Sequence, residues 1–264
     1  MTDAWNPVVY ERFRDERALP FHDLLALVTP GPIARAVDLG CGTGELSSIA
    51  AERLGIGELV GVDSSPAMLA RCAEIARPPA VTFEAGDIGS WTSAADHDLV
   101  LANASLQWVP DHVGVVRRWV RALRPGGQLA VQVPANADHP SHRIAAEVAA
   151  EEPFRSAFPD GPPEDQVARN VLAPEAYAAL LHELGFEHQH VALRVYPHVL
   201  ASTAEVVNWV RGTTLTRFES RLPADVYARF LDRYAERLLD VVGRQEPYFY
   251  AFKRILVWGR LPAE

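Results

Sequence analysis

The sequence predicts an α/β fold, a doubly wound and mostly parallel sheet of seven strands. Three observations lead to this prediction. Short apolar runs alternate with helical stretches along the chain, and five of these runs lie between residues 36 and 133. The runs are apolar at consecutive positions, which is typical of strands buried on both faces of a parallel sheet. A glycine-rich turn follows the first run, where doubly wound folds carry a binding site.

The predicted elements follow one another from residue 31 onward. The strands are expected at 36–39, 59–62, 81–83, 99–102, 129–133, 188–196 and 250–258. The helices are expected at 45–54, 66–76, 112–123, 142–151, 174–184, 202–211 and 223–242. Pro-Gly in 124–127 predicts a tight turn before the fifth strand. Ser202 and Glu205 have the spacing of a capping box.

The length of 264 residues allows one large domain with insertions. We expect a single domain over 1–264, in which three helical segments form a cap over the substrate site. These segments are the N-terminal helices of 1–30, with a second helix at about 21–28, and the stretches 139–175 and 200–248. Stretch 153–163 is the expected insertion loop, because five of its eleven residues are Pro or Gly.

The composition excludes several classes of protein. Hydrophobic residues make up 48% and charged residues 22%, as in ordinary globular chains. The first seventeen residues lack the apolar core of a signal peptide, and no apolar run is long enough to span a membrane, so we expect a cytoplasmic protein. A net charge of −9 argues against nucleic acid as a partner. The two cysteines and nine histidines lack metal-ligand spacing, so no metal site is predicted. Oligomeric state is left open.

The glycine-rich turn carries the first functional signal. Asp38 ends the first strand, and Gly40, Gly42 and Gly44 precede the next helix. Missing Cβ atoms let a ligand lie against the turn, and the helix behind it offers free N–H groups. A tight turn with no ligand would have the same pattern.

Two further acidic residues favour a ligand. Asp63 ends the second strand and Asp87 follows the third, so three carboxylates meet at the carboxyl edge of the sheet. The Gly-x-Gly-x-Gly spacing differs from the Gly-x-Gly-x-x-Gly that wraps a pyrophosphate. Asp38 would repel a phosphate but would suit an amine, which favours a nucleoside that carries an amino acid over a nicotinamide dinucleotide.

On these residues the sequence resembles the class I S-adenosylmethionine-dependent methyltransferases, most strongly over about 35–135. The resemblance implies their Rossmann-like fold and S-adenosylmethionine as the cofactor. By this resemblance, the methionine part would contact Asp38, Gly40, Cys41, Gly42 and Gly44. The ribose would contact Asp63, the adenine would contact Asp87 and Ile88, and Ser64 and Met68 would flank the nucleoside. The methyl group would lie near Asn103, Ala104 and Ser105.

A closer resemblance, to the trans-aconitate 2-methyltransferase family, spans most of the chain. It rests on Ala4-Trp5-Asn6-Pro7, on the ten residues from Asn103 to His112, and more weakly on segments near Trp209 and Arg254. The resemblance implies a carboxyl O-methyltransferase that esterifies one carboxylate of trans-aconitate or of a similar small polycarboxylate. Where family members can read Glu-Arg-x-Arg-Pro, this chain has Leu19 in place of the second arginine.

Such a reaction would depend on positioning, and no catalytic residue is predicted. A carboxylate, with a pKa of about 4, is already deprotonated at neutral pH and needs no general base. The polyanion itself needs donors in a pocket. The preferred substrate-binding residues are Tyr10, Arg17, Gln107, Trp108 and Arg254, and Arg12, Arg211 and Lys253 are further candidates. Each arginine could equally be a surface charge, Trp108 and Tyr10 could be packing residues, and Gln107 and Ser105 could cap a loop.

Three other functions stay open at this point. The same cofactor half could serve another small acceptor. The chain could bind the cofactor as a regulatory module without turnover, although the intact block after the fourth strand favours catalysis. A nicotinamide oxidoreductase is the least favoured alternative.

Overall fold

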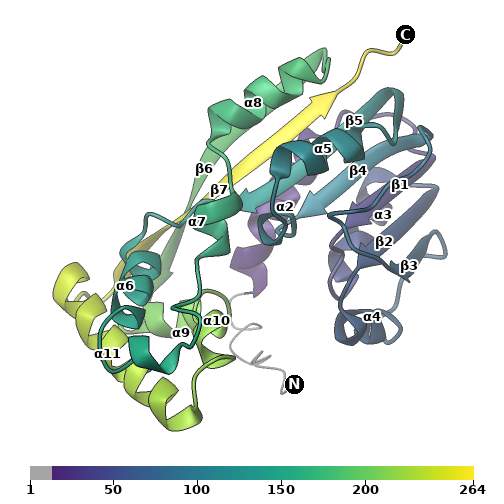
Figure 1. Cartoon of the computed structure of the whole chain (residues 1–264). Helices are drawn as coiled ribbons and strands as arrows, with labels where there is room; N and C mark the ends of the chain where they lie inside the picture. The colour runs from purple at the N-terminus through teal and green to yellow at the C-terminus, as the bar shows by residue number, and fades with distance from the viewer. Residues whose placement is uncertain (1–13) are drawn as a thin grey trace. The chain divides into compact units, whose positions relative to one another are not determined.

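The computed structural model describes residues 14–264, with side chains from Ala18 onward. It divides into two compact units (Figure 1). The sheet unit comprises 18–134, 170–194 and 254–264. The helical unit comprises 135–169 and 195–253 together with 14–17. The predicted insertions at 139–175 and 200–248 thus fall mainly in the helical unit, and their place over a substrate site stays a prediction.

The sheet has seven strands in the order β3-β2-β1-β4-β5-β7-β6, which confirms the predicted fold class. The strands are β1 (Arg35–Leu39), β2 (Glu58–Asp63), β3 (Val81–Ala85), β4 (His97–Asn103), β5 (Leu123–Pro134), β6 (His188–Leu200) and β7 (Tyr248–Arg260). The pairs within β1 to β5 are parallel, and β7 runs antiparallel to β5. Because the chain order reverses between β1 and β4, a crevice is expected at their carboxyl ends.

Apolar residues on both faces of the central strands explain why they form a buried sheet. Leu39, Leu59, Leu99 and Leu129 are fully buried. The helices of this unit are α2 (Arg14–Leu27), which starts outside it, α3 (Glu45–Leu54), α4 (Pro66–Cys72), α5 (His112–Val120) and α8 (Pro174–Glu183). Phe21 of α2 is fully buried and packs into the same core as Leu59.

Three local predictions differ from the structure, the first only in where the helix begins. The helix expected at about 21–28 is the end of α2, which already includes Arg14 and continues through Pro20 because buried Phe21 and Leu24 hold it on the core. Residues 124–127 form a bulge inside β5, since the register with β4 shifts between His97 and Leu99 and Gly126 has a φ of 79°. The capping box does not form, because α9 begins at Glu205 and its N-cap is Ala204.

An aromatic core holds the helical unit together. Its helices are α6 (Pro140–Ala149), the 3-10 turn η2 (Arg155–Ala157), α7 (Gln166–Asn170), whose last residue lies in the sheet unit, α9 (Glu205–Arg211), α10 (Thr216–Glu219) and α11 (Ala224–Val242). Phe230 of α11 lies 4.8 Å from Phe218 and 5.6 Å from Phe154, measured between ring centroids. The fully buried Phe218 and Phe230 fix α10 and α11 against each other.

The part of the chain that the structure describes has no membrane-spanning helix and no cluster of metal ligands. Within residues 14–264, no helix is both long and apolar enough to cross a membrane. The same residues contain no group of three or more His, Cys, Asp or Glu side chains that could hold a metal ion.

Candidate functional site

The glycine turn between β1 and α3 has the left-handed backbone that its three glycines predict. Gly40, Gly42 and Gly44 have φ values of 86°, 57° and 77°. A Cβ on Gly40 would lie 2.2 Å from the Cβ of Ser105, and one on Gly44 would lie 2.3 Å from the ring of Phe83. A Cβ on Gly42 would meet no described atom within 4 Å. Packing within the protein therefore requires two of the glycines, and only Gly42 faces open space.

Asp38, at the end of β1, has one carboxylate oxygen available for a ligand. The side chain is 3% exposed, and its Oδ2 accepts a hydrogen bond of 2.6 Å from Ser47 Oγ. Its buried Oδ1 has no hydrogen-bond partner among the described residues. Burial raises the pKa of Asp38 to about 6, the charge of Asp63 adds to this rise, and the hydrogen bond from Ser47 opposes it. A cationic amine would satisfy Oδ1 and favour the ionised form.

Asp63, at the end of β2, joins two turns. Its Oδ2 accepts a hydrogen bond of 2.9 Å from the backbone N–H of Gly42, and its Oδ1 accepts one of 2.9 Å from Ser65 N–H. Each carboxylate oxygen can accept a second hydrogen bond, so the group can still bind a hydroxyl. Ser64 is exposed and Met68 is half-buried, and Met68 N–H donates to Ser65 Oγ at 3.4 Å.

The loop after β3 is held by α5. Asp87 is exposed, and its two oxygens accept hydrogen bonds of 2.9 Å from Gly89 N–H and from Ser90 Oγ. The hydrogen bonds from Gly89 and Ser90 lower the pKa of Asp87. The carbonyl of Ile88 accepts a hydrogen bond of 2.9 Å from the indole of the buried Trp119. An ionised Asp87 on an anchored loop fits the predicted adenine contact.

The end of β4 brings buried polar side chains to the same edge of the sheet. Ser105 Oγ donates to the Leu39 carbonyl at 2.5 Å, which ties this end to β1. Ala104 has a φ of 52°, which is rare for a residue other than glycine. Gln107 is 4% exposed, and its Nε2 donates to the Ala104 carbonyl at 2.6 Å. Within the described chain, Asn103 Oδ1 and Gln107 Oε1 are buried without a hydrogen-bond partner.

Gln132 is a candidate that the sequence analysis missed. It lies in β5 in register with Asn103, so the two side chains share one face of the sheet. The side chain is 2% exposed, and its Nε2 has no partner among residues 18–264. A glutamine within the apolar run of 129–133 was the available signal, because an amide is rarely buried without a reason.

The remaining predicted residues differ in burial, and two of them are not described by the structure. Arg254 in β7 lies opposite Pro134, which puts it at the carboxyl edge of the sheet, and it is half-buried. Trp108 is 57% exposed. Cys41 is buried, and burial raises the pKa of its thiol, so the thiol stays protonated. Tyr10 and the side chain of Arg17 lie outside the described residues.

Two positively charged candidates from the C-terminal half lie in the helical unit. Lys253 is already paired there, since its Nζ lies 2.6 Å from Asp138 Oδ1 and 2.5 Å from Asp138 Oδ2. Arg211 ends α9 and is exposed. The pairing of Lys253 and the exposure of Arg211 give no support for a substrate role.

A separate cavity lies at the opposite ends of the parallel strands. Its volume is about 250 Å³, and Ile33, Asp98, Arg124 and Gln128 are among its lining residues. Arg124 forms an ion pair with Asp98. These residues precede β1 or belong to the first parts of β4 and β5, so the cavity is far from the carboxyl edge where Asp38 and Asp63 lie.

Comparisons with known proteins agree with this geometry. Residues 36–127 match the model of a methyltransferase domain. A trans-aconitate 2-methyltransferase of Deinococcus radiodurans is 42% identical, over 98% of this chain and 99% of the relative. One of Variovorax paradoxus is also 42% identical, over 97% and 96%. The YcgJ protein of Bacillus subtilis, 16% identical, shares the fold with a TM-score of 0.58 over 92% of this chain and 98% of its own. The chain therefore belongs to the trans-aconitate 2-methyltransferase family within the class I S-adenosylmethionine-dependent methyltransferases.

Proposed function

We propose that the protein transfers the methyl group of S-adenosylmethionine to one carboxylate of trans-aconitate. The observation that carries this proposal is the buried Asp38 carboxylate at the carboxyl end of β1, which has one oxygen without a described partner. A sulfonium cofactor has an amino acid tail, and the ammonium group of this tail is the cation that the oxygen needs. Relatives that cover almost all of the chain carry the name of the acceptor.

The residues at the carboxyl edge fit this cofactor. Asp38 and the turn of Gly40, Cys41, Gly42 and Gly44 would hold the methionine part, Asp63 the ribose, Ser64 and Met68 the sides of the nucleoside, and Asp87 with Ile88 the adenine. Asn103, Ala104 and Ser105 would lie near the methyl group. The free face of Gly42 and the second lone pairs on Asp63 leave room and acceptors for these contacts.

The cofactor supplies a methyl group on a positively charged sulfur, and the substrate supplies a carboxylate oxygen. In the transfer, the carbon–sulfur bond would break as the carbon–oxygen bond forms, and the positive charge on sulfur would be lost. Because the attacking oxygen is already ionised, the protein's task is to hold it about 3 Å from the methyl carbon and in line with the leaving sulfur. Gln107, Trp108 and Arg254, with Tyr10 and Arg17, are the residues that we propose for this orientation.

One feature of the sequence favours a different small acceptor for the same cofactor. Leu19 stands where family members can have the second arginine of Glu-Arg-x-Arg-Pro, and it is 50% exposed. One donor for a carboxylate is therefore missing from this segment, which would suit an acid with fewer charges than trans-aconitate.

Methyl transfer from labelled cofactor to a panel of acids tests the proposal. The panel contains trans-aconitate, cis-aconitate, citrate, itaconate and succinate, with a phenol and an amine as unrelated acceptors. We expect base-labile methyl ester from trans-aconitate above all others. Turnover of a dicarboxylate in preference would support the alternative acceptor. Turnover of only the phenol or the amine would refute carboxyl transfer, and folded protein that does not bind S-adenosylhomocysteine in calorimetry would refute the methyltransferase itself.

A further inference from the structure

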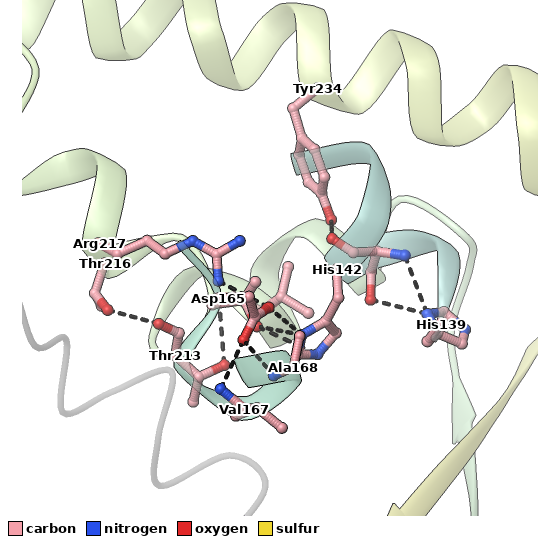
Figure 2. Close-up of polar contacts among 12 residues, drawn as sticks. His139, His142, Asp165, Val167, Ala168, Thr213, Thr216, Arg217 and Tyr234 are labelled. Atoms are coloured by element: carbon pink, nitrogen blue, oxygen red, sulfur yellow. Dashed lines mark hydrogen bonds and ion pairs between the residues drawn. The ribbon is translucent and has the colours of Figure 1, made fainter. Parts of the chain in front are cut away.

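The helical unit contains a buried polar cluster that joins two of its segments. His142 of α6 and Asp165 come from the first segment, 135–169, and Arg217 comes from the second, 195–253 (Figure 2). Thr214 of the second segment has its hydroxyl 3.3 Å from His142 Nε2. The side chains of His142, Asp165 and Arg217 are only 11%, 13% and 16% exposed. A charged cluster this well shielded from water needs every charge to be matched.

Asp165 is fixed in the centre of this cluster. Its Oδ1 accepts a hydrogen bond of 3.0 Å from Val167 N–H, and its Oδ2 lies 3.2 Å from His142 Nδ1 and 2.8 Å from Arg217 Nη1 (Figure 2). Burial alone would raise the pKa of Asp165, but the hydrogen bond from His142 and the charge of Arg217 outweigh it and hold the pKa below its usual value. Asp165 is therefore an anion whose oxygens are already engaged.

Arg217 uses only one side of its guanidinium group in these contacts. Nη1 binds Asp165, and the guanidinium carbon lies 4.7 Å from the ring centroid of the buried Phe218. Nε and Nη2 are buried and have no hydrogen-bond partner among the described residues.

The two unpartnered donors have the geometry of a carboxylate receptor. Nε and Nη2 form one edge of the guanidinium plane, and their parallel N–H bonds match the two oxygens of a carboxylate. A buried positive charge with an unused donor pair binds an anion more strongly than the same group in water, because the local dielectric is low. A lysine could pair with Asp165 but could not offer this edge.

We propose that Arg217 binds a carboxylate group of a small organic acid through Nε and Nη2, while Asp165 and His142 hold the guanidinium in place. The identification of that acid with the methyl acceptor rests on the proposed function.

Calorimetry with trans-aconitate, on the full chain saturated with S-adenosylhomocysteine, tests this site. Arg217→Lys keeps the charge beside Asp165 but loses the paired donors, and Arg217→Gln loses both. Because a charge-assisted pair of hydrogen bonds is removed, we expect affinity to fall about 10-fold in the first variant and about 100-fold in the second. The trimethyl ester of trans-aconitate has no carboxylate, so neither the wild type nor either Arg217 variant should bind it.

Arg237→Gln is the matched control. Arg237 lies in α11 of the same unit and pairs with Glu151 at 3.0 Å and Glu147 at 3.3 Å, but its own side chain is 32% exposed. Its loss should change affinity for the acid by less than about twofold, because Arg237 pairs with Glu147 and Glu151 and not with the cluster around Asp165. Thermal melting and binding of S-adenosylhomocysteine report on the fold of every variant.

Steady-state kinetics then separate the outcomes. A higher KM for trans-aconitate in Arg217→Lys, with the KM for S-adenosylmethionine unchanged, would show that the acid on Arg217 is the methyl acceptor. Loss of a second binding equivalent with unchanged kinetics would show that it is a separate acid. Folded Arg217 variants with wild-type affinity and stoichiometry would overturn the inference even when methyl transfer is intact. Wild type that binds the acid through Arg217 but transfers no methyl group would overturn only the proposed function.

Discussion

The carboxylate of Asp63 accepts a hydrogen bond of 2.9 Å from the backbone N–H of Gly42, so the end of β2 holds the turn that follows β1. The same carboxylate also fixes the turn into α4 through Ser65 N–H. The proposed ribose contact is thus also a structural support for the glycine turn. Substitution of Asp63 should affect the cofactor through both roles.

Asp63→Asn should weaken binding of S-adenosylhomocysteine by about 10- to 100-fold, because the amide keeps one acceptor oxygen but loses the charge and the second acceptor. Calorimetry measures the change. Glu58→Gln is the control, since Glu58 begins the same strand, is exposed and lies at the opposite edge of the sheet. Equal losses in both variants would contradict a specific ribose contact.

Gly40→Ala and Gly42→Ala should separate packing from binding. Both place a side chain on a left-handed backbone, which costs about 1–2 kcal/mol. Gly40→Ala also drives its Cβ into Ser105, so its free energy of unfolding should fall further. Gly42→Ala should stay the more stable of the two in urea denaturation but should lose more affinity for S-adenosylhomocysteine. The reverse ranking in binding would place the ligand elsewhere.

Cofactor affinity should fall as the pH drops through about 6, the raised pKa of Asp38. Protonation removes the negative charge that we propose to pair with the ligand's ammonium group, so affinity should fall by up to about tenfold per pH unit below that value. Titrations of S-adenosylhomocysteine between pH 5 and 8 test this. Ser47→Ala removes the hydrogen bond that lowers the pKa, so the midpoint should move upward.

The raised pKa of Asp38 has the opposite effect on the stability of the ligand-free protein, which it lowers as the pH rises. The unfolded Asp38 ionises near its ordinary pKa of 3.8, and the folded one ionises near 6 because burial disfavours its charge. The folded state therefore binds more protons between these values, and the Asp38 contribution to the free energy of unfolding falls as the pH rises from 3.8 to about 6. The free energy of unfolding of the wild type minus that of Asp38→Asn should decline across this window, because all other titrating groups contribute equally to both proteins.

Arg254→Gln should raise the KM for trans-aconitate about tenfold and leave the KM for the cofactor unchanged, because it removes a donor at the carboxyl edge of the sheet. Arg260→Gln is the control on the same strand, since Arg260 lies opposite Gln128 in the first half of β5. Arg17→Gln tests the other arginine of the predicted pair. Wild-type kinetics for Arg254→Gln would remove it from the substrate site.

The sequence predicted the fold well wherever short-range patterns decide it. Short apolar runs predicted β1 to β5, and the acids at positions 38, 63 and 87 all lie at or just after the carboxyl ends of β1 to β3. Failures occurred where tertiary packing decides the outcome. Buried Phe21 and Leu24 keep α2 helical past Pro20, and Ser202 forms no capping box although its spacing allowed one.

The candidates that rest on buried, unpaired polar atoms were the least predictable from the sequence. Gln132 had one sequence signal, an amide within the apolar run of 129–133. Arg217 looks ordinary in the sequence, and only its shielding from water with unused hydrogen-bonding atoms marks it. Such a state depends on residues distant in the chain, as when Asp165 occupies one nitrogen of Arg217 and leaves two without partners among the described residues. No local pattern contains that information.

The different surroundings of the three glycines have a consequence for the divergence of such proteins. A descendant that lost the cofactor would still need glycine at positions 40 and 44, because Ser105 and Phe83 occupy the space of a side chain there. Position 42, which faces open space, would be released from that selection and could drift toward Asn or Asp, which tolerate its backbone. Substitution of Gly42, more than of the motif as a whole, is therefore the first change expected in a descendant that has lost its activity.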